Sequence, residues 1–397
     1  MKIGIDASRN RSGGAKAHLI GILTECRPEK HGINEIHVWS FRSLLDQLPN
    51  YPWLIKHNPK ALEQSLFRQL LWQATGLAGE AKEAGCDILF TTDASTLCRF
   101  KPMVVLSQDM LSYEPGVMRH FGYGIARLRL IAILVLQNLA FRRADGVIFL
   151  TRYAANIIQQ SCGTLPFIAY VPHGVGSEFK QAQWINTRLE SDNHIIRCIY
   201  VSNTEMYKHQ WEVVRAIAAL RKRGHKLKIS LVGGGSGRAH DLLQREIAAS
   251  DPEGVFVEQL DFLPQAALPM HLANSDLFVF ASSCENLPVT LLEAMAVGLP
   301  IASSSRGPML EILADGGVYF DPEDAESIAY AVEQIVTDEA LRTRIAKRAK
   351  KLSAQYSWQR CSDETFAFIN ATALNAKAAF RMRENHACPT SQNDHQH

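Results

Sequence analysis

The sequence lacks several features that would place it at once in a class of protein. No two of its eight cysteines form a CxxC pair, which argues against a zinc ribbon or a thioredoxin-like redox site. Lys and Arg (42) nearly balance Asp and Glu (40), so a nucleic-acid partner is not expected. The longest apolar run, residues 130–136, falls far short of the roughly 20 residues that a transmembrane helix needs.

Targeting and metal-binding signals are also missing. The first residues lead directly into a strand-like run, without the charged and then apolar segments of a secretory signal. Single, scattered cysteines are typical of a reducing compartment. No cluster of His, Cys, Asp or Glu has metal-ligand spacing, and there is no DxD run, so no metal cofactor is expected. These absences predict a soluble, cytoplasmic protein and leave attachment to a membrane surface open.

The sequence does contain a regular alternation of strand-like and helix-length segments. A chain of 397 residues exceeds the roughly 250–300 that one core supports, so we expect two domains. Short apolar strands separated by helices are typical of parallel βαβ units. Expected strands lie at 2–6, 35–41, 87–92, 103–107, 146–151 and 167–171, then at 197–201, 228–232, 255–259, 276–280, 301–303 and 317–320. Expected helices lie at 15–24, 59–84, 121–143, 152–161, 210–223, 237–250, 264–273, 290–297, 308–314, 323–337 and 339–355.

This alternation predicts an α/β fold of two Rossmann-like domains that face each other across a cleft. It breaks at residues 174–194, an aperiodic stretch that we interpret as the linker. The predicted domains are therefore residues 1–180 and 181–356. A further helix over 357–380 follows, with packing against the first domain as one possibility. The polar residues 381–397 are expected to be a disordered tail.

The most informative motif is SCENLPVTLLEAMAVGLP, residues 283–300. Its two carboxylates, Glu285 and Glu293, are eight residues apart, and Pro288 favours the start of a helix between them. A helix N-terminus beside a strand end offers free N–H groups and a positive dipole end to a pyrophosphate. The spacing thus predicts two carboxylates that flank a nucleotide. The alternative, that both merely stabilise a helix dipole, stays open on spacing alone.

Loops after other expected strands carry further candidates. Lys208 follows the strand 197–201, and the glycines Gly13 and Gly14 follow the first strand. Three glycines in LVGGGSG (231–237) permit close approach of the backbone to a ligand. A solvated lysine and ordinary tight turns are the alternatives for these positions.

Residues 283–300 resemble the EX7E signature of retaining glycosyltransferases of the GT4 family, which has the GT-B fold. The resemblance continues downstream into residues 302–336 and upstream as far as residue 261, and it covers nearly the whole second domain and, more weakly, the first. It implies that Glu293 holds the ribose of a nucleotide and that Glu285 contacts the donor sugar. It also implies that the turn with Asn286, Leu287 and Thr290 meets the sugar and the diphosphate.

The same resemblance implies roles for the remaining candidate residues and shows two positions at which this sequence departs from the family pattern. It implies that Lys208 binds the diphosphate, that Gly13 and Gly14 approach it from the first domain, and that Gly234 lies by the base. Asn203 stands where the family has an arginine, and Gln108 stands where it often has a histidine. Asp109 remains as a catalytic candidate on the acceptor side. Arg306 or Arg152 is a possible replacement for the missing cation, and His173 occupies an asparagine position of the family.

The resemblance implies transfer of a sugar from a nucleotide-diphosphate sugar to a glycan or lipid-linked acceptor, with retention of configuration and without a metal. Bacterial lipopolysaccharide, O-antigen or another surface polysaccharide is the expected setting. A sugar phosphorylase, synthase or epimerase of the same fold is one alternative. A weakly active scaffold subunit is another, since Asn203 and Gln108 depart from the family.

Two segments without acidic residues, 115–144 and 340–362, carry most of the clustered positive charge. They are either solvated helix faces, neutralised by acids elsewhere, or surfaces that contact an anionic membrane. Contact with the inner face of the cytoplasmic membrane is therefore an open expectation.

Overall fold

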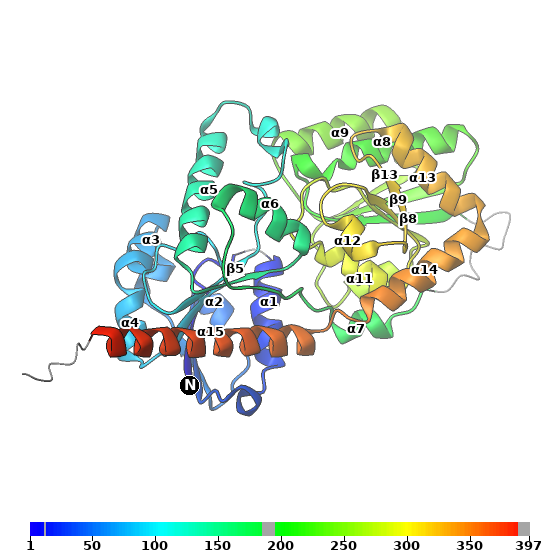
Figure 1. The fold of residues 1–397 in the computed structure, drawn as a ribbon. Helices are drawn as coiled ribbons and strands as arrows, with labels where there is room; N and C mark the ends of the chain where they lie inside the picture. The colour runs from blue at the N-terminus through cyan, green and yellow to red at the C-terminus, as the bar shows by residue number, and fades with distance from the viewer. Residues whose placement is uncertain (12, 185–194, 388–397) are drawn as a thin grey trace, which may run out of the picture.

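The computed structural model describes residues 1–11, 13–184 and 195–387 of the chain (Figure 1). They form two α/β domains, each built on a sheet whose strands are all parallel, as the alternation predicts. The first sheet has the order β3 (Leu54–His57), β2 (Glu35–Trp39), β1 (Lys2–Asp6), β4 (Ile88–Thr91), β5 (Met103–Ser107), β6 (Gly146–Phe149) and β7 (Ile168–Tyr170). The second has the order β10 (Val257–Leu260), β9 (Leu227–Val232), β8 (Ile196–Val201), β11 (Leu277–Phe280), β12 (Ile301–Ser304) and β13 (Val318–Phe320).

Both sheets reverse their strand order beside the first strand of the domain, β1 in one and β8 in the other. In sheets of this kind, ligands bind outside the carboxyl ends of the strands at that reversal. The central strands are buried on both faces, which explains their continuous apolar runs. Strand β3 was not predicted, because it is a partly exposed edge strand with a mixed sequence, LIKH.

Helices connect the strands in each domain. Those of the first domain are α1 (Gly13–Thr24), α2 (Arg42–Leu45), α3 (Leu66–Thr75), α4 (Leu77–Glu83), α5 (Ile125–Arg143) and α6 (Arg152–Cys162), and the short α7 (Ser177–Gln181) follows where the chain crosses to the second domain. Those that follow are α8 (Gln210–Lys222), α9 (Arg238–Ser250), α10 (Leu268–Ala273), α11 (Val289–Val297), α12 (Met309–Leu313), α13 (Ala325–Thr337), α14 (Glu339–Ser353) and α15 (Trp358–Ala387). Short 3₁₀ turns include η2 (Lys60–Glu63), η3 (Val117–Phe121) and η5 (Met206–Lys208). None of the helices in the described parts of the chain is both long and apolar enough to span a membrane.

Two expected helices differ from their predicted bounds. The expected helix 59–84 is divided into η2, α3 and α4, with a break at Gly76. The expected helix 121–143 begins only at Ile125, because Gly122 adopts a positive φ of 57°. In both cases glycine, the weakest helix former after proline, marks the break.

The last helix, α15, runs back along the first domain, where it packs against α1 and the strands β4, β5 and β6 (Figure 1). At its start, the ring of Trp358 lies directly over Gly21, where a Cβ atom would collide with it. Ser362 donates a hydrogen bond to the carbonyl oxygen of Ile22 at 2.8 Å. The chain therefore crosses between the domains twice, once before α7 and once before α15.

The segments expected to lack structure need two corrections. Residues 381–387, expected to be part of a disordered tail, continue α15, since this segment consists largely of good helix formers. Residues 177–181, inside the expected linker, form α7 and pack against α11 of the second domain. The rest of the expected linker, 185–194, and of the expected tail, 388–397, lie outside the described residues.

The return of α15 depends on a close backbone contact at Gly174. A Cβ atom at this position would collide with the backbone nitrogen of Trp358. We expect Gly174→Ala to lower the free energy of unfolding by about 1–3 kcal/mol, the usual cost of overpacking. Thermal denaturation measures this change.

Gly79→Ala is the matched control, because a Cβ atom there meets nothing within 4 Å and the residue lies in α4. It should be neutral or stabilise the protein by up to about 1 kcal/mol. Equal effects of the two substitutions would contradict the packing argument.

Candidate active site

A cavity of about 450 Å³ lies between the two domains, at the carboxyl ends of strands from both sheets. Its lining from the first domain includes Asn10, Gly14, Asp93, Gln108 and Asp109, which follow β1, β4 and β5. Its lining from the second domain includes Tyr207, Glu285, Asn286 and Leu287. Sites in open parallel sheets form at such strand ends, so this cavity is the candidate active site.

Glu285, in the wall from the second domain, forms an ion pair with Lys208. Both side chains are largely buried, with 13% and 14% of their surface exposed. The residues are 77 positions apart but meet because β8 and β11 are neighbours in the sheet. The backbone N–H of Ser283 donates to the carbonyl oxygen of Tyr207 at 2.8 Å and joins the two loops.

Asn286 connects this wall to the first domain. Its side-chain amide donates to the carbonyl and hydroxyl oxygens of Ser107, both at 3.3 Å. The hydroxyl of Thr151 donates to the carbonyl oxygen of Asn286 at 3.1 Å. The amide nitrogen of Asn286 is thus engaged within the protein, whereas its Oδ1 has no partner.

On the first domain's side, Gln108 and Asp109 follow β5 directly. The side chain of Gln108 donates to the carbonyl oxygen of Thr92 at 3.2 Å. The backbone N–H of Leu111 donates to Asp109 at 2.9 Å. Asp109 is exposed at the cavity, and partial desolvation there, with a smaller contribution from the neighbouring Asp93, raises the pKa of its carboxyl.

The glycine pair lies in the first turn of α1, and Gly14 lines the cavity. A Cβ atom at Gly13 or Gly14 would meet nothing within 4 Å. Packing within the protein therefore does not require glycine here. The open space leaves room for a ligand beside the N-terminal turn of α1.

Asn203 and Gly234 lie together at the ends of β8 and β9, but neither lines this cavity. The two turns pack closely, since a Cβ atom at Gly233 would approach the carbonyl oxygen of Ser202 to 2.5 Å. The N–H of Thr204 donates to the carbonyl oxygen of Gly234 at 3.0 Å. Asn203 itself is exposed.

The structure separates the two carboxylates of the 283–300 motif. Glu285 lines the cavity, whereas Glu293 lies in the second turn of α11 and is only 4% exposed. The side-chain amide of Gln265 donates to Glu293 at 2.9 Å. Burial raises the pKa of Glu293 to about 8, so its carboxyl is mainly protonated at neutral pH. Thr290, half-buried, is the second residue of the same helix.

Arg152 and Arg306, the two cations considered as replacements, line a different cavity of about 890 Å³ between the domains. Arg306 pairs with Asp321 at 3.0 Å, and the Arg152 guanidinium lies over the Tyr170 ring at 4.4 Å. Neither reaches the cavity that Glu285 lines. Beside them, the carboxylate of Glu311 accepts the backbone N–H groups of Arg152 and Tyr153 at 2.9 and 2.8 Å. This contact joins α12 of one domain to the start of α6 in the other.

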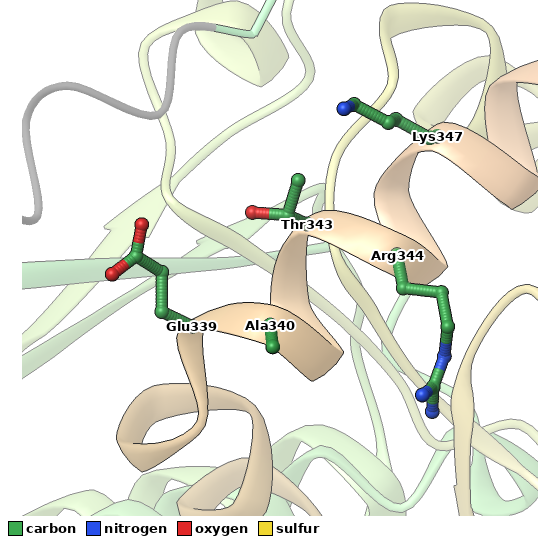
Figure 2. A pocket seen from close by; sticks show the side chains of 5 residues that line it. All are labelled: Glu339, Ala340, Thr343, Arg344 and Lys347. Carbon is green, nitrogen blue, oxygen red and sulfur yellow. The ribbon is translucent and has the colours of Figure 1, made fainter.

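A third hollow, of about 560 Å³, lies on α14 (Figure 2). All five of its lining residues come from this one helix: Glu339, Ala340, Thr343, Arg344 and Lys347. In Figure 2 their polar ends point in different directions and do not converge. A binding site needs convergent polar groups, so we do not assign one here.

Sequence reasoning missed several residues of the interdomain cavity, including Asn10, Asp93 and Tyr207. Asn10 and Asp93 follow the ends of predicted strands, so a survey of polar residues at those positions would have found both. Tyr207 carries no comparable signal. Among the described residues, no three His, Cys, Asp or Glu side chains gather as a metal site requires.

A family model described as "Glycosyl transferases group 1" matches residues 186–352. The O-antigen chain mannosyltransferase B of Escherichia coli is 27% identical over 176 residues, which are 44% of this chain and 45% of that protein. A GDP-mannose-dependent phosphatidylinositol monomannoside mannosyltransferase of Mycolicibacterium smegmatis is 30% identical over 52% of this chain and 58% of its own length. The chain thus aligns with about half of the length of these relatives.

Solved structures resemble the chain over nearly its whole length. Sucrose-phosphate synthase from Thermosynechococcus elongatus superposes with a TM-score of 0.73 at 15% identity, covering 98% of this chain and all of that one. HepE from Anabaena in complex with UDP-glucose superposes with a TM-score of 0.65 at 21% identity, covering 96% and 100%. At these identities the likeness establishes the fold.

The buried carboxyl of Glu293 predicts a pH-dependent stability. Its folded pKa, about 8, exceeds the ordinary value of 4.5, so its contribution to stability falls as the pH rises between these values. Glu293→Gln removes the titration and should raise Tm relative to wild type more at about pH 8.5 than at about pH 5. The exposed Glu253 offers a control, and Glu253→Gln should leave the pH dependence of Tm unchanged. An equal Tm difference at both pH values would argue against a neutral Glu293.

Proposed function

The chain carries a group 1 glycosyl transferase domain in a GT-B fold, and from this we propose that it transfers a sugar from a nucleotide-diphosphate sugar to a glycan or lipid-linked acceptor. The observation that carries this proposal is the Lys208–Glu285 pair, in which Glu285 faces the strand ends of the first domain across the interdomain cavity. Relatives named for O-antigen and lipopolysaccharide core synthesis support a surface polysaccharide as the setting.

In the proposed complex, the Lys208 ammonium binds the diphosphate and stabilises the charge that develops on it as the leaving group. The three N–H donors of a lysine can serve Glu285 and a phosphate oxygen together. Glu285 positions the transferred sugar, and the turn from Asn286 to Thr290 supplies backbone N–H groups at the start of α11. Positive charge from Lys208 and the helix dipole makes transfer without a metal the simplest proposal.

The remaining candidates extend this arrangement. Gly13 and Gly14 leave space for the diphosphate on the first domain's side. Asn203 and Gly234 lie beside the nucleotide. A protonated Glu293 can donate a hydrogen bond to a ribose hydroxyl as well as accept one. Asp109 faces the acceptor side. We propose retention with the leaving phosphate as the acceptor of the proton, the mechanism that the resemblance to the GT4 family implies.

Substitution of the ion pair tests the site. We expect Glu285→Gln and Lys208→Met each to lower kcat for sugar transfer by about 10²-fold or more, the usual effect of losing a preorganised charge. Release of nucleotide from UDP-, GDP- and ADP-sugars measures the rate. Lys347→Met, on the surface of α14, is the matched control and should be as active as wild type. Wild-type rates in both site variants would refute the assignment.

The same panel distinguishes the alternatives. Binding of a nucleotide sugar stabilises the folded state and raises Tm, so a thermal shift identifies the donor. Sugar phosphates or free epimers among the products would indicate a phosphorylase, synthase or epimerase. No binding of any nucleotide sugar would favour a scaffold.

We further propose that α5 binds to an anionic membrane surface, where a lipid-linked acceptor would lie. Its exposed apolar residues Ile125, Leu128, Ile131, Val135 and Leu139 follow one stripe of the helix. The exposed Arg129, Arg142 and Arg143 supply positive charge on the same helix. Apolar groups flanked by arginines match an interface with anionic lipid headgroups.

The second basic segment, 340–362, offers less free charge. Arg342 is buried and donates to the carbonyl oxygens of Ile335 and Val336. Arg348 pairs with Asp315, and Arg360 pairs with Glu364. We therefore restrict the membrane proposal to α5.

Cosedimentation with vesicles tests the surface. The protein should sediment with phosphatidylglycerol-containing vesicles at low salt, less at high salt, and less still with phosphatidylcholine alone. A double substitution Ile125→Ser and Leu128→Ser should weaken binding by about tenfold. Tyr330→Ser, which alters an exposed aromatic on α13, should not. Absence of wild-type binding at low salt would contradict the proposal.

A further inference from the structure

His173 lies where the chain leaves the first domain, between β7 and α7. His173 is among the residues that line the interdomain cavity, although only 3% of its surface is exposed. Neither Nδ1 nor Nε2 has a hydrogen-bond partner. Burial lowers the pKa of the imidazole to about 3, so the ring is neutral and carries one N–H donor and one acceptor. Buried polar groups are nearly always paired, so two unpartnered nitrogens beside a cavity require an explanation.

Aromatic neighbours fix the plane of this ring. His173 stacks on His18 with the ring centroids 4.6 Å apart and an interplanar angle of 26°. Trp358 lies beside both rings, at 5.9 Å from His173 and 6.4 Å from His18. The backbone after His173 is held as well, since Val175 forms a β-bridge with Ser357, and the space beside Gly174, where a Cβ atom would collide with the nitrogen of Trp358, is filled. The imidazole is therefore held in one orientation before any ligand binds.

The chemistry of the ring selects the kind of ligand group it would take. A neutral imidazole donates one hydrogen bond and accepts another, which matches a hydroxyl group. A phosphate, which only accepts and carries charge, suits the ammonium of Lys208 on the opposite wall better. Sugars present hydroxyl groups, and the cavity also holds Glu285, the residue proposed to position the sugar.

We infer that His173 is a substrate-positioning residue that hydrogen-bonds a sugar hydroxyl in the interdomain cavity. This inference rests on the function proposed above. The hydroxyl belongs either to the transferred sugar of the donor or to the acceptor. Loss of the His173 nitrogens impairs donor binding in the first case and acceptor binding in the second. If His173 only packs against His18, replacing its ring nitrogens impairs neither donor binding nor acceptor binding.

His18, the other histidine of the stacked pair, provides a matched control for substitution of His173. His173→Phe keeps an aromatic ring against His18 and Trp358 but removes both nitrogens. His18→Phe makes the same change in the same stack at a residue that does not line the cavity, although its Nδ1 is also unpartnered. His173→Asn and His173→Gln each restore a donor and an acceptor near one of the two ring nitrogens.

The variants are compared in Tm, in affinity for UDP-glucose, GDP-mannose, UDP and GDP, and in transfer to octyl α-mannoside as a surrogate acceptor. We expect both phenylalanine variants to remain folded with similar Tm. If the hydroxyl belongs to the donor, His173→Phe lowers the affinity for the nucleotide sugar by about tenfold but leaves the affinity for the nucleotide without a sugar unchanged. If it belongs to the acceptor, donor affinity is unchanged and the KM for octyl α-mannoside rises by a similar factor. His173→Asn or His173→Gln should recover part of the loss.

His173→Phe with the affinities and rates of His18→Phe would overturn the inference while leaving the proposed function intact. Wild-type protein that binds no nucleotide sugar and transfers none would overturn both. Wild-type protein that binds a donor without turnover still tests His173 through the difference in affinity between nucleotide sugar and nucleotide.

Discussion

The hydrogen bonds around Asn286 hold the two halves of the candidate site together. Its amide reaches Ser107 at the end of β5, and Thr151 at the end of β6 reaches its carbonyl oxygen. Each domain alone would expose only one wall of the cavity. Because these contacts place the loop after β11 against the first sheet, the Lys208–Glu285 pair faces the loops after β1, β4 and β5. The contact of Glu311, in α12, with the start of α6 reinforces the same arrangement, as does the returning α15.

Burial gives the polar groups near this junction two different states. Lys208 and Glu285 pair with each other where both side chains are largely buried. Glu293 and His173 have no opposite charge beside them, and burial favours the neutral form of each. The site therefore combines one charged pair, suited to a diphosphate, with the neutral His173, which can both donate and accept hydrogen bonds and is suited to a hydroxyl; the neutral Glu293 lies outside the cavity lining. This division fits the two parts of a nucleotide sugar.

Much of the fold was predictable because parallel sheets impose a strong pattern on the sequence. The strands at 2–6 and 103–107 have their predicted bounds, since buried parallel strands read as continuous apolar runs. The edge strand β3 escaped prediction because it is only partly buried. The spacing of Glu285 and Glu293 correctly located a strand end and a helix start. It did not reveal that one carboxylate lines the cavity while the other is covered by Gln265, because Gln265 belongs to a different loop.

The sequence by itself determined the two domains, the alternation of strands and helices, and the loops in which polar residues gather. These features depend on local periodicity and on glycine and proline, which act over a few residues. Only the tertiary structure decided which loops meet. Lys208 finds Glu285 because β8 and β11 are neighbours in the sheet. Arg306 pairs with Asp321 and does not line the cavity. His173 stacks on His18, which lies in α1. Contacts between residues so far apart in the chain follow from strand order and domain docking, which no local pattern encodes.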